Sequence, residues 1–245
     1  MKYLLHPAYF PNIFTFTVIA QKEVRWEVED NYQKQTYRNR CYVCTDQGKH
    51  MLSIPIQHVG GEQGRQKYRE VLLDNSYPWQ RNHWRTLQTA YRTSPFFEFY
   101  EDDIAPLYLN YFEKLLDFNL KTIEIICDCL QLGMPGDSTE NYELKPNGVA
   151  DLRFLVNAKR RLNIPQDRYV QVFGDRHAFV RNASILDLLF NEGTNALEYL
   201  NRQRIPGDHS QIREGNPQIR EDKSKKPDYK HGLPYGEPQT PDIDA

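Results

Sequence analysis

The chain has 245 residues, of which 39% are hydrophobic and 26% are charged, so it can bury the core of one domain. Its formal net charge of −2 excludes a sequence-independent attraction to nucleic acid or to an anionic membrane surface. Aromatic residues reach 13%, which favours a globular protein with polar clefts, because a Tyr ring can pack while its hydroxyl forms hydrogen bonds.

The amino-terminal residues do not resemble a signal peptide. His6, Pro7 and Pro11 interrupt the first apolar run before it reaches the ~7–15 residues that such a signal needs. No stretch approaches the roughly 20 apolar residues of a membrane-spanning helix. We therefore expect a cytoplasmic protein with no membrane span and no nucleic-acid partner.

Strands are predicted mainly in the first half of the chain. Apolar and alternating patterns indicate strands, and Gly48 supplies the turn of a hairpin. The predicted strands are 2–5, 23–29, 40–45, 49–56 and 69–74. Residues 12–21 are expected to form a short helix, in which β-branched residues lower the helix propensity.

Helices are predicted mainly in the second half. Pro78 suits the first turn of a helix that runs to about Arg92, and apolar residues recur at helical spacing over about 105–132. The remaining expected elements are a helix over 149–161, a strand over 168–173 and a helical segment over 184–203 that breaks at Gly193.

This order of elements predicts an α/β fold. We expect a mixed β-sheet flanked by helices, with a mainly helical second half, in a single domain over 1–204. Residues 205–245 have few apolar side chains and many Pro, Gly and charged residues. Such a composition cannot bury enough apolar surface to order itself, so this segment is predicted to be a disordered tail.

The four cysteines are predicted to be reduced and structural. Cys41 and Cys44 lie in a predicted strand, where residues three apart point to opposite faces. Cys127 and Cys129 lie in a predicted helix, where residues two apart do not face each other. Neither pair is therefore expected to hold a metal, and no cofactor is expected.

The segment "HPAYFPN", residues 6–12, directly follows the first predicted strand. In open α/β sheets, ligands bind beyond the carboxyl ends of strands. His6, with an ordinary pKa of ~6.5, could transfer a proton or donate to a phosphate there. A rigid Pro-rich turn with a capping His is the equally weighted structural alternative.

The segment "EDNYQKQTYRNR", residues 29–40, is almost entirely polar. Glu29 and Asp30 precede three cations, which are Lys34, Arg38 and Arg40. Such a set can hold a carboxylate or a phosphate through charge-assisted hydrogen bonds, and Asn39 adds a donor and an acceptor. From the pattern alone, a solvated loop explains the segment as well.

Two further clusters have structural explanations that compete with functional ones. His83 shares a helix face with Trp79 and Leu87, and most histidines among apolar neighbours are satisfied core residues. Ser184 and Asp187 are three residues apart at the start of a predicted helix, so capping is the default interpretation.

At these clusters the sequence resembles the WbqC-like family. The family's patterns H-Q-P-x-Y-x-P and Q-K-x-x-x-x-N-R are similar to "HPAYFPN" and "QKQTYRNR". Its D-N-x-x-x-W-x-x-x-H and Y-x-x-x-P-[YF]-F segments match "DNSYPWQRNHW" and "YRTSPFF", and "SILDLLFNEG" follows near the end. The matches span about residues 3–195 in family order.

The resemblance implies a bacterial protein of O-antigen or other surface-polysaccharide biosynthesis. It suggests N-acyl or aminoacyl transfer to an amino sugar, with a nucleotide- or lipid-linked sugar as substrate. The expected catalytic bases are His6 and His83, and the expected substrate-binding residues are Tyr9, Asp30, Lys34, Asn39, Arg40 and Tyr91. The alternative is a non-catalytic ligand-binding or assembly protein of the same pathway.

Overall fold

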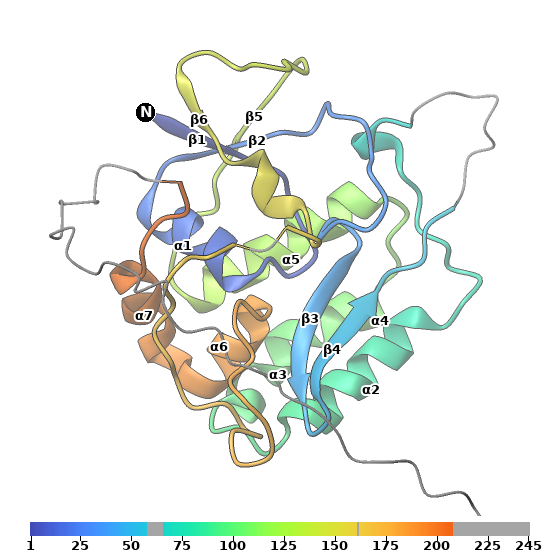
Figure 1. The fold of residues 1–245 in the computed structure, drawn as a ribbon. Helices are drawn as coiled ribbons and strands as arrows, with labels where there is room; N and C mark the ends of the chain where they lie inside the picture. The colour runs from blue at the N-terminus through green and yellow to red at the C-terminus, as the bar shows by residue number, and fades with distance from the viewer. Residues whose placement is uncertain (58–65, 161, 208–245) are drawn as a thin grey trace, which may run out of the picture. The chain divides into compact units, whose positions relative to one another are not determined.

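Parallel strand pairing builds the larger sheet of the protein (Figure 1). The computed structural model describes residues 1–57, 66–160 and 162–207. Within them, the parallel strands β1 (Lys2–Leu5), β2 (Val24–Trp26), β5 (Asp137–Ser138) and β6 (Val149–Asp151) pair in the order β5-β2-β1-β6. A separate antiparallel hairpin consists of β3 (Arg40–Thr45) and β4 (Gly48–Ser53). The predicted α/β class is confirmed, with parallel and antiparallel pairing in separate sheets.

The first crossover of the sheet is the predicted short helix, α1 (Ile13–Gln21). Asn12 caps it, because its side-chain oxygen accepts a hydrogen bond from Thr15 N at 3.0 Å. The hydroxyl of Thr17 donates to the Ile13 carbonyl at 2.9 Å, which satisfies a buried polar group in the helix. Residues 13–19 are all buried, so packing on every side outweighs the modest helix propensity of the sequence.

The remaining α-helices supply most of the core. Phe and Leu side chains from several of them form one buried cluster with β1, β2 and the hairpin, and ring pairs such as Tyr91 with Phe190 lie within it. The helices are α2 (Trp79–Tyr91), α3 (Phe97–Ile104), α4 (Pro106–Leu109), α5 (Leu115–Cys129), α6 (Ile185–Glu192) and α7 (Ala196–Arg202). Together they hold the hairpin and the parallel sheet in one compact unit.

Gly193 separates α6 from α7, as predicted. Its φ of +54° is unfavourable for a side chain, and a Cβ there would lie 2.4 Å from the Phe96 ring. Only glycine therefore fits this turn without displacing the ring.

Two of the predicted helices are wrong. The helix expected over about 105–132 is two helices, because residues 110–114 are extended and Leu73 N bonds to the Glu113 carbonyl at 2.9 Å. The helix expected over 149–161 is the strand β6 followed by a 3-10 turn, Arg153–Val156. Pairing with β1 determines this segment, which a local pattern cannot show.

Three predicted strands also differ from the structure. The strand over 23–29 ends at Trp26, and 69–74 begins as a 3-10 turn and then makes only single bridges. Residues 168–173 form no strand among the described residues, because Tyr169 and Gln171 turn their side chains to the buried Asp187. Tertiary contacts thus override alternation in these segments.

Two further expectations concern membrane-spanning helices and the predicted tail. No helix in the described ranges is long and apolar enough to cross a membrane. The predicted tail, 205–245, lies outside the described residues except for its first three, of which Ile205 packs into the core. The predicted boundary at 204 remains a prediction.

Candidate functional site

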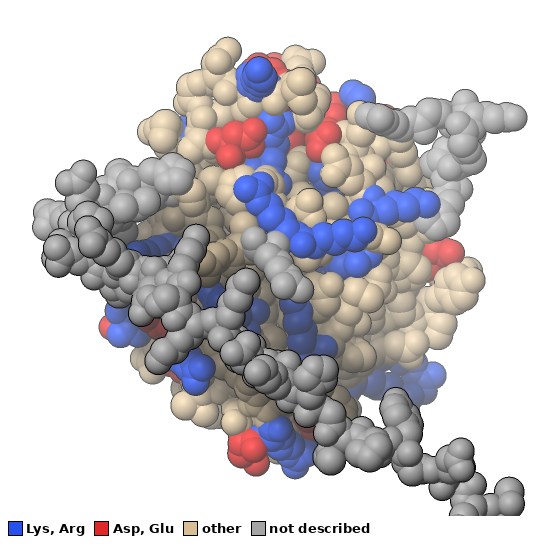
Figure 2. Space-filling model, viewed as in Figure 1, with Lys and Arg blue, Asp and Glu red and all other residues tan. Residues whose placement is uncertain are grey.

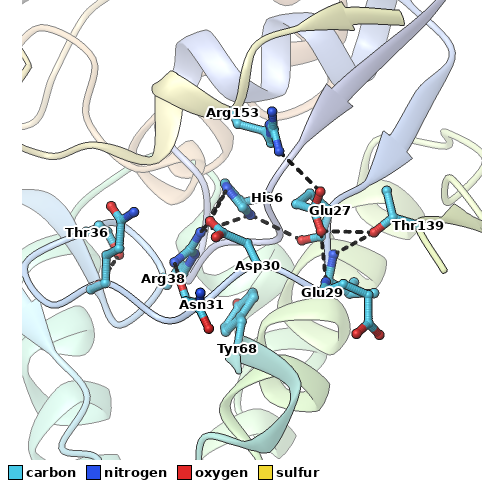
Figure 3. A network of polar contacts seen from close by, with 12 residues as sticks. His6, Glu27, Glu29, Asp30, Asn31, Thr36, Arg38, Tyr68, Thr139 and Arg153 are labelled. Carbon is cyan, nitrogen blue, oxygen red and sulfur yellow. Dashed lines mark hydrogen bonds and ion pairs between the residues drawn. The ribbon is translucent and has the colours of Figure 1, made fainter. Parts of the chain in front are cut away.

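Polar side chains follow all four parallel strands at their carboxyl ends (Figure 3). His6 directly follows β1, Glu27 follows β2 and Thr139 follows β5. Arg153 begins the turn after β6. β2 and β6 flank β1 on opposite sides, so the strand order reverses between β1 and β6. Open α/β sheets bind ligands beyond the carboxyl ends of the strands at such a reversal.

Arg38 joins His6 and Asp30 into one buried cluster. Its Nη2 donates to His6 Nε2 and to Asp30 Oδ2, each at 2.8 Å. The Arg38 side chain is 1% exposed and the His6 side chain 3%, so both groups are removed from bulk water. Such charge-assisted hydrogen bonds are strong and fix the direction of each group.

Burial and the Arg38 charge lower the pKa of His6 to about 4, so its imidazole is neutral at pH 7. His6 Nδ1 lies 3.2 Å from the Glu27 carbonyl oxygen, which can only accept. The neutral ring therefore donates from Nδ1, and its Nε2 lone pair faces Arg38. Burial alone would raise the pKa of Asp30, but His6 and Arg38 outweigh it and lower that pKa to about 2.

Arg153 and Glu27 form the second part of the network. Arg153 Nη1 is 3.4 Å from Glu27 Oε2, and two Arg153 nitrogens bond Asp151 at 2.7 and 2.9 Å. The other Glu27 oxygen accepts from the Thr139 hydroxyl at 3.0 Å and from Glu29 N at 2.8 Å. This carboxylate, 1% exposed, thus connects the ends of β2, β5 and β6.

A cavity of about 290 Å³ opens beside this network. His6, Asp30 and Arg38 line one part of it, and Asp151 and Arg153 line another. The further lining residues are Gln33, Tyr142, Phe154, Val156 and Asn157. Paired charges, two amides and two aromatic rings suit a hydroxyl-rich small molecule, whose hydroxyls can both donate and accept while its carbon faces lie on the rings.

The segment that carries Arg38 also holds unsatisfied polar atoms. Arg38 Nη1 donates to the Asn31 carbonyl at 3.0 Å, and its guanidinium lies 5.0 Å from the Tyr68 ring centre. Among the described residues, five buried side-chain atoms have no hydrogen-bond partner, namely Tyr32 Oη, Arg38 Nε, Asn39 Oδ1, Arg40 Nε and Asn119 Oδ1. Buried polar atoms normally have partners, so residues 32–40 offer bonding capacity to a ligand or to ordered water.

The second expected base, His83, belongs to a different set of contacts. Its Nδ1 lies 3.0 Å from the Tyr9 hydroxyl, which also bonds the Tyr108 hydroxyl at 2.8 Å. Its ring packs edge-on against Trp79. Burial lowers the pKa of His83 to about 4. His83 and Tyr9 are thus brought together with each other and not with the lining of the His6 cavity.

Tyr91 lies in a third cluster. Its hydroxyl donates to Asp187 Oδ1 at 2.8 Å and accepts from Cys44 N at 3.0 Å. The second Asp187 oxygen accepts from Tyr169 and Gln171, and the carboxylate is fully buried. Burial raises the pKa of Asp187. These contacts tie α6 to α2 and to the hairpin, which is a packing role.

The remaining expected binding residues lie on or before the hairpin. Lys34 is exposed next to Gln33, which lines the cavity. Asn39 donates to the Ile54 carbonyl at 3.0 Å, and Arg40 begins β3 opposite Ser53. The structure therefore brings His6 and Asp30 together, and it places the other six expected residues outside that pair's direct contacts.

The cysteines contribute no cluster of ligands. Cys41 and Cys44 lie on β3 and are both buried, and burial raises the pKa of the Cys44 thiol to about 12. In the ranges that the structure describes, no three His, Cys, Asp or Glu side chains are arranged to hold a metal ion.

Sequence reasoning missed three central residues. Arg38 was one of the three noted cations, but nothing in the pattern distinguished its buried guanidinium from that of Arg40. Glu27 was placed inside a strand, whereas its position just after β2 was the signal that could have found it. Arg153 was hidden by the wrong helix prediction over 149–161.

Comparison with known proteins supports the resemblance. The chain matches the WbqC-like protein family over residues 6–172. It is also 30% identical over 198 residues to the "Uncharacterized protein Rv1507c" of Mycobacterium tuberculosis, a match that covers 69% of this chain and 83% of that protein. No solved structure matches it significantly. Since the family match covers more than half of the chain and includes His6, Arg38 and Arg153, the chain belongs to the WbqC-like protein family.

Proposed function

We propose that this protein is a group-transfer enzyme of surface-polysaccharide biosynthesis, which acylates an amino sugar held in the His6 cavity. The convergence of His6, Asp30, Arg38 and Arg153 on one cavity beyond the parallel strands carries the proposal. Figure 2 shows a band of Lys and Arg side chains across the face that it views, below a group of Asp and Glu. Such a band favours a substrate with an anionic group, such as a nucleotide- or lipid-linked sugar.

The reaction needs a base that takes a proton from the amine. The amine nitrogen attacks the carbonyl carbon of an activated acyl donor, the new C–N bond forms and the bond to the leaving group breaks. When an anionic substrate group draws Arg38 Nη2 away from the Nε2 lone pair, His6 Nε2 accepts the proton that the nitrogen loses and passes it to the departing group. Guanidinium groups stabilise the negative charge that develops on the carbonyl oxygen.

Substrate binding would make His6 a better base. In the structure Arg38 faces the Nε2 lone pair, and its charge contributes to the low pKa of His6. An anionic substrate group that bonds the Arg38 guanidinium from the cavity offsets this charge. The pKa of His6 then rises toward the working pH, which makes proton transfer more effective.

Incubation with a panel of UDP- and dTDP-linked amino sugars and acetyl-coenzyme A tests this proposal. We expect mass spectrometry to detect an acylated sugar, and His6→Gln to lower kcat by roughly 10²–10⁴-fold. His50→Gln, which changes an exposed histidine on β4, is the matched control, and circular dichroism checks the fold of both. No product from any pair, together with full complementation of a deletion strain by His6→Ala, contradicts the enzymatic proposal.

The second candidate is a non-catalytic protein that binds the same ligand. The low pKa values of His6 and His83 favour it, since a general base works best near the ambient pH. Under this alternative, UDP-linked amino sugars raise the melting temperature of the protein, and no acyl transfer follows. Turnover in the same preparation rules it out.

A further inference from the structure

A second cavity lies between the hairpin, α2 and the turn at residues 173–176, and it shares no lining residue with the His6 cavity. Its volume is about 530 Å³, within the ~300–1,000 Å³ range of small-molecule sites. Ala90, which is buried on α2, lies at its base, and Phe173 supplies an aromatic wall.

Two arginines and a histidine reach this cavity from three separate parts of the chain. Arg85 comes from α2, Arg176 from the 173–176 turn and His50 from β4. Asp46 is the only acidic residue among the described residues that line the cavity, and its Oδ2 lies 4.0 Å from Arg176 Nη1. Among the described residues Arg85 has no ion-pair partner within that distance, so the cavity keeps an excess of positive charge.

The sequence of α2 strengthens this imbalance. The helix contains Arg81 and Arg85 and no acidic residue, so nothing on its own surface neutralises Arg85. The hydroxyls of Thr86 and Thr89 donate to helix carbonyls, each at 2.9 Å, and are not free to donate to a ligand. The two guanidinium groups are therefore the principal donors, and guanidinium forks match phosphate oxygens.

We propose that this cavity binds a phosphorylated small molecule, with the phosphate between Arg85 and Arg176 and the rest of the ligand against Phe173. Bidentate contacts from two arginines provide the orientation, and an aromatic wall can hold a flat or apolar group. The site is separate from the proposed acyl transfer, and its occupation does not depend on that reaction.

Calorimetric titration of the full chain with inorganic phosphate, uridine monophosphate and glucose 1-phosphate tests this site. We expect saturable binding of at least one probe, weakened about tenfold or more by Arg85→Gln and by Arg176→Gln. Arg81→Gln, which changes an exposed arginine one turn away on the same helix, is the matched control and keeps wild-type affinity. All three arginines are exposed, so these variants are expected to fold normally.

The three probes distinguish the part of the ligand that the cavity recognises. If uridine monophosphate binds more tightly than phosphate and Phe173→Ala removes this difference, the aromatic wall holds a base. If glucose 1-phosphate binds more tightly than phosphate, the wall holds a sugar. Equal affinities confine recognition to the phosphate. The proposal is overturned if no probe shows saturable binding, or if Arg85→Gln and Arg176→Gln bind the probes as tightly as the wild type does. This holds whatever the outcome of the acyl-transfer assay.

Discussion

At the scale of single residues, the buried guanidinium of Arg38 holds the candidate site together. Arg38 bonds His6, Asp30 and the Asn31 carbonyl, although each of these groups alone would be unfavourable in a water-poor environment. The cluster is therefore interdependent, since removal of its cation leaves a buried carboxylate without a counter-charge.

We expect Arg38→Met to destabilise the fold by about 3–5 kcal/mol, because it leaves the Asp30 carboxylate with only His6, which is neutral at pH 7, beside it. Urea denaturation measures this difference. Arg69→Met is the control, since Arg69 is half-exposed in its ion pair with Glu29, and such pairs contribute about 1 kcal/mol or less. Equal losses in both variants would show that the buried cluster has no special role in stability.

The two buried histidines should make stability depend on pH. Burial, and at His6 the Arg38 charge, lower both pKa values to about 4 from 6.5. Between pH 6.5 and 4 the unfolded chain binds protons that the folded protein does not, so stability falls as the pH drops through this window. Each histidine accounts for at most about 3 kcal/mol of this loss.

Urea denaturation at several pH values between 4 and 7 measures that effect. We expect His6→Gln and His83→Gln each to flatten the pH dependence, even where the variant is less stable overall. The exposed His50 provides the comparison: its charge makes only a minor contribution to the lowered pKa of His83, so His50→Gln should change the slope less than either core variant. A wild-type slope in both core variants would refute the lowered pKa values.

At the scale of elements, short strands and turns determine where the functional groups lie. β2 ends at Trp26 and β6 at Asp151, so Glu27 and Arg153 leave the sheet at the same edge as His6. The Glu27 bond to the Thr139 hydroxyl joins segments 112 residues apart, and Arg153 bonds the nearby Glu143 and Leu144 carbonyls. The β5–β6 connection is thereby fixed over the cavity edge.

The turn between α6 and α7 is expected to be intolerant of any side chain. Gly193→Ala should destabilise the protein by about 2–4 kcal/mol, because it combines backbone strain with a clash against Phe96. Thermal denaturation measures the change. Gly133→Ala is the control, because a Cβ at Gly133 meets no atom within 4 Å. In a protein that already carries Phe96→Ala, the clash is absent, so Gly193→Ala should cost only the part of the stability that is due to backbone strain.

At the scale of the whole molecule, the last described residues are part of the core. Ile205 is 7% exposed, and Gln203 accepts a hydrogen bond from Asp167 N at 3.2 Å. The buried part of the fold therefore continues beyond α7 to Ile205, and the exact boundary of the domain stays a prediction.

Two truncations test this boundary. A chain that ends at Gly207 should keep the wild-type melting temperature, whereas one that ends at Arg202 should lose about 4–10 °C, because it lacks the buried Ile205. Differential scanning calorimetry measures both. A large fall in the melting temperature of the chain that ends at Gly207 would show that the residues after 207 stabilise the domain.

Local sequence patterns were sufficient for the elements that are stabilised locally. The strand "KYLL", a short helix over 12–21 and the break at Gly193 were all predicted, because apolar patterns and a glycine act on adjacent residues. The same patterns failed at 149–161 and 168–173, where pairing with β1 and bonds to Asp187 decide the conformation.

The sequence by itself determined the α/β class, the family and the polar segment that carries the candidate site. Only the tertiary structure decided which polar residues meet: His6 joins Asp30 and Arg38, while His83 and Tyr91 belong to other clusters. The physical reason is that composition and spacing record residue types along the chain. Burial and the convergence of strand ends, which set the pKa values and partners of those residues, arise from contacts between distant segments.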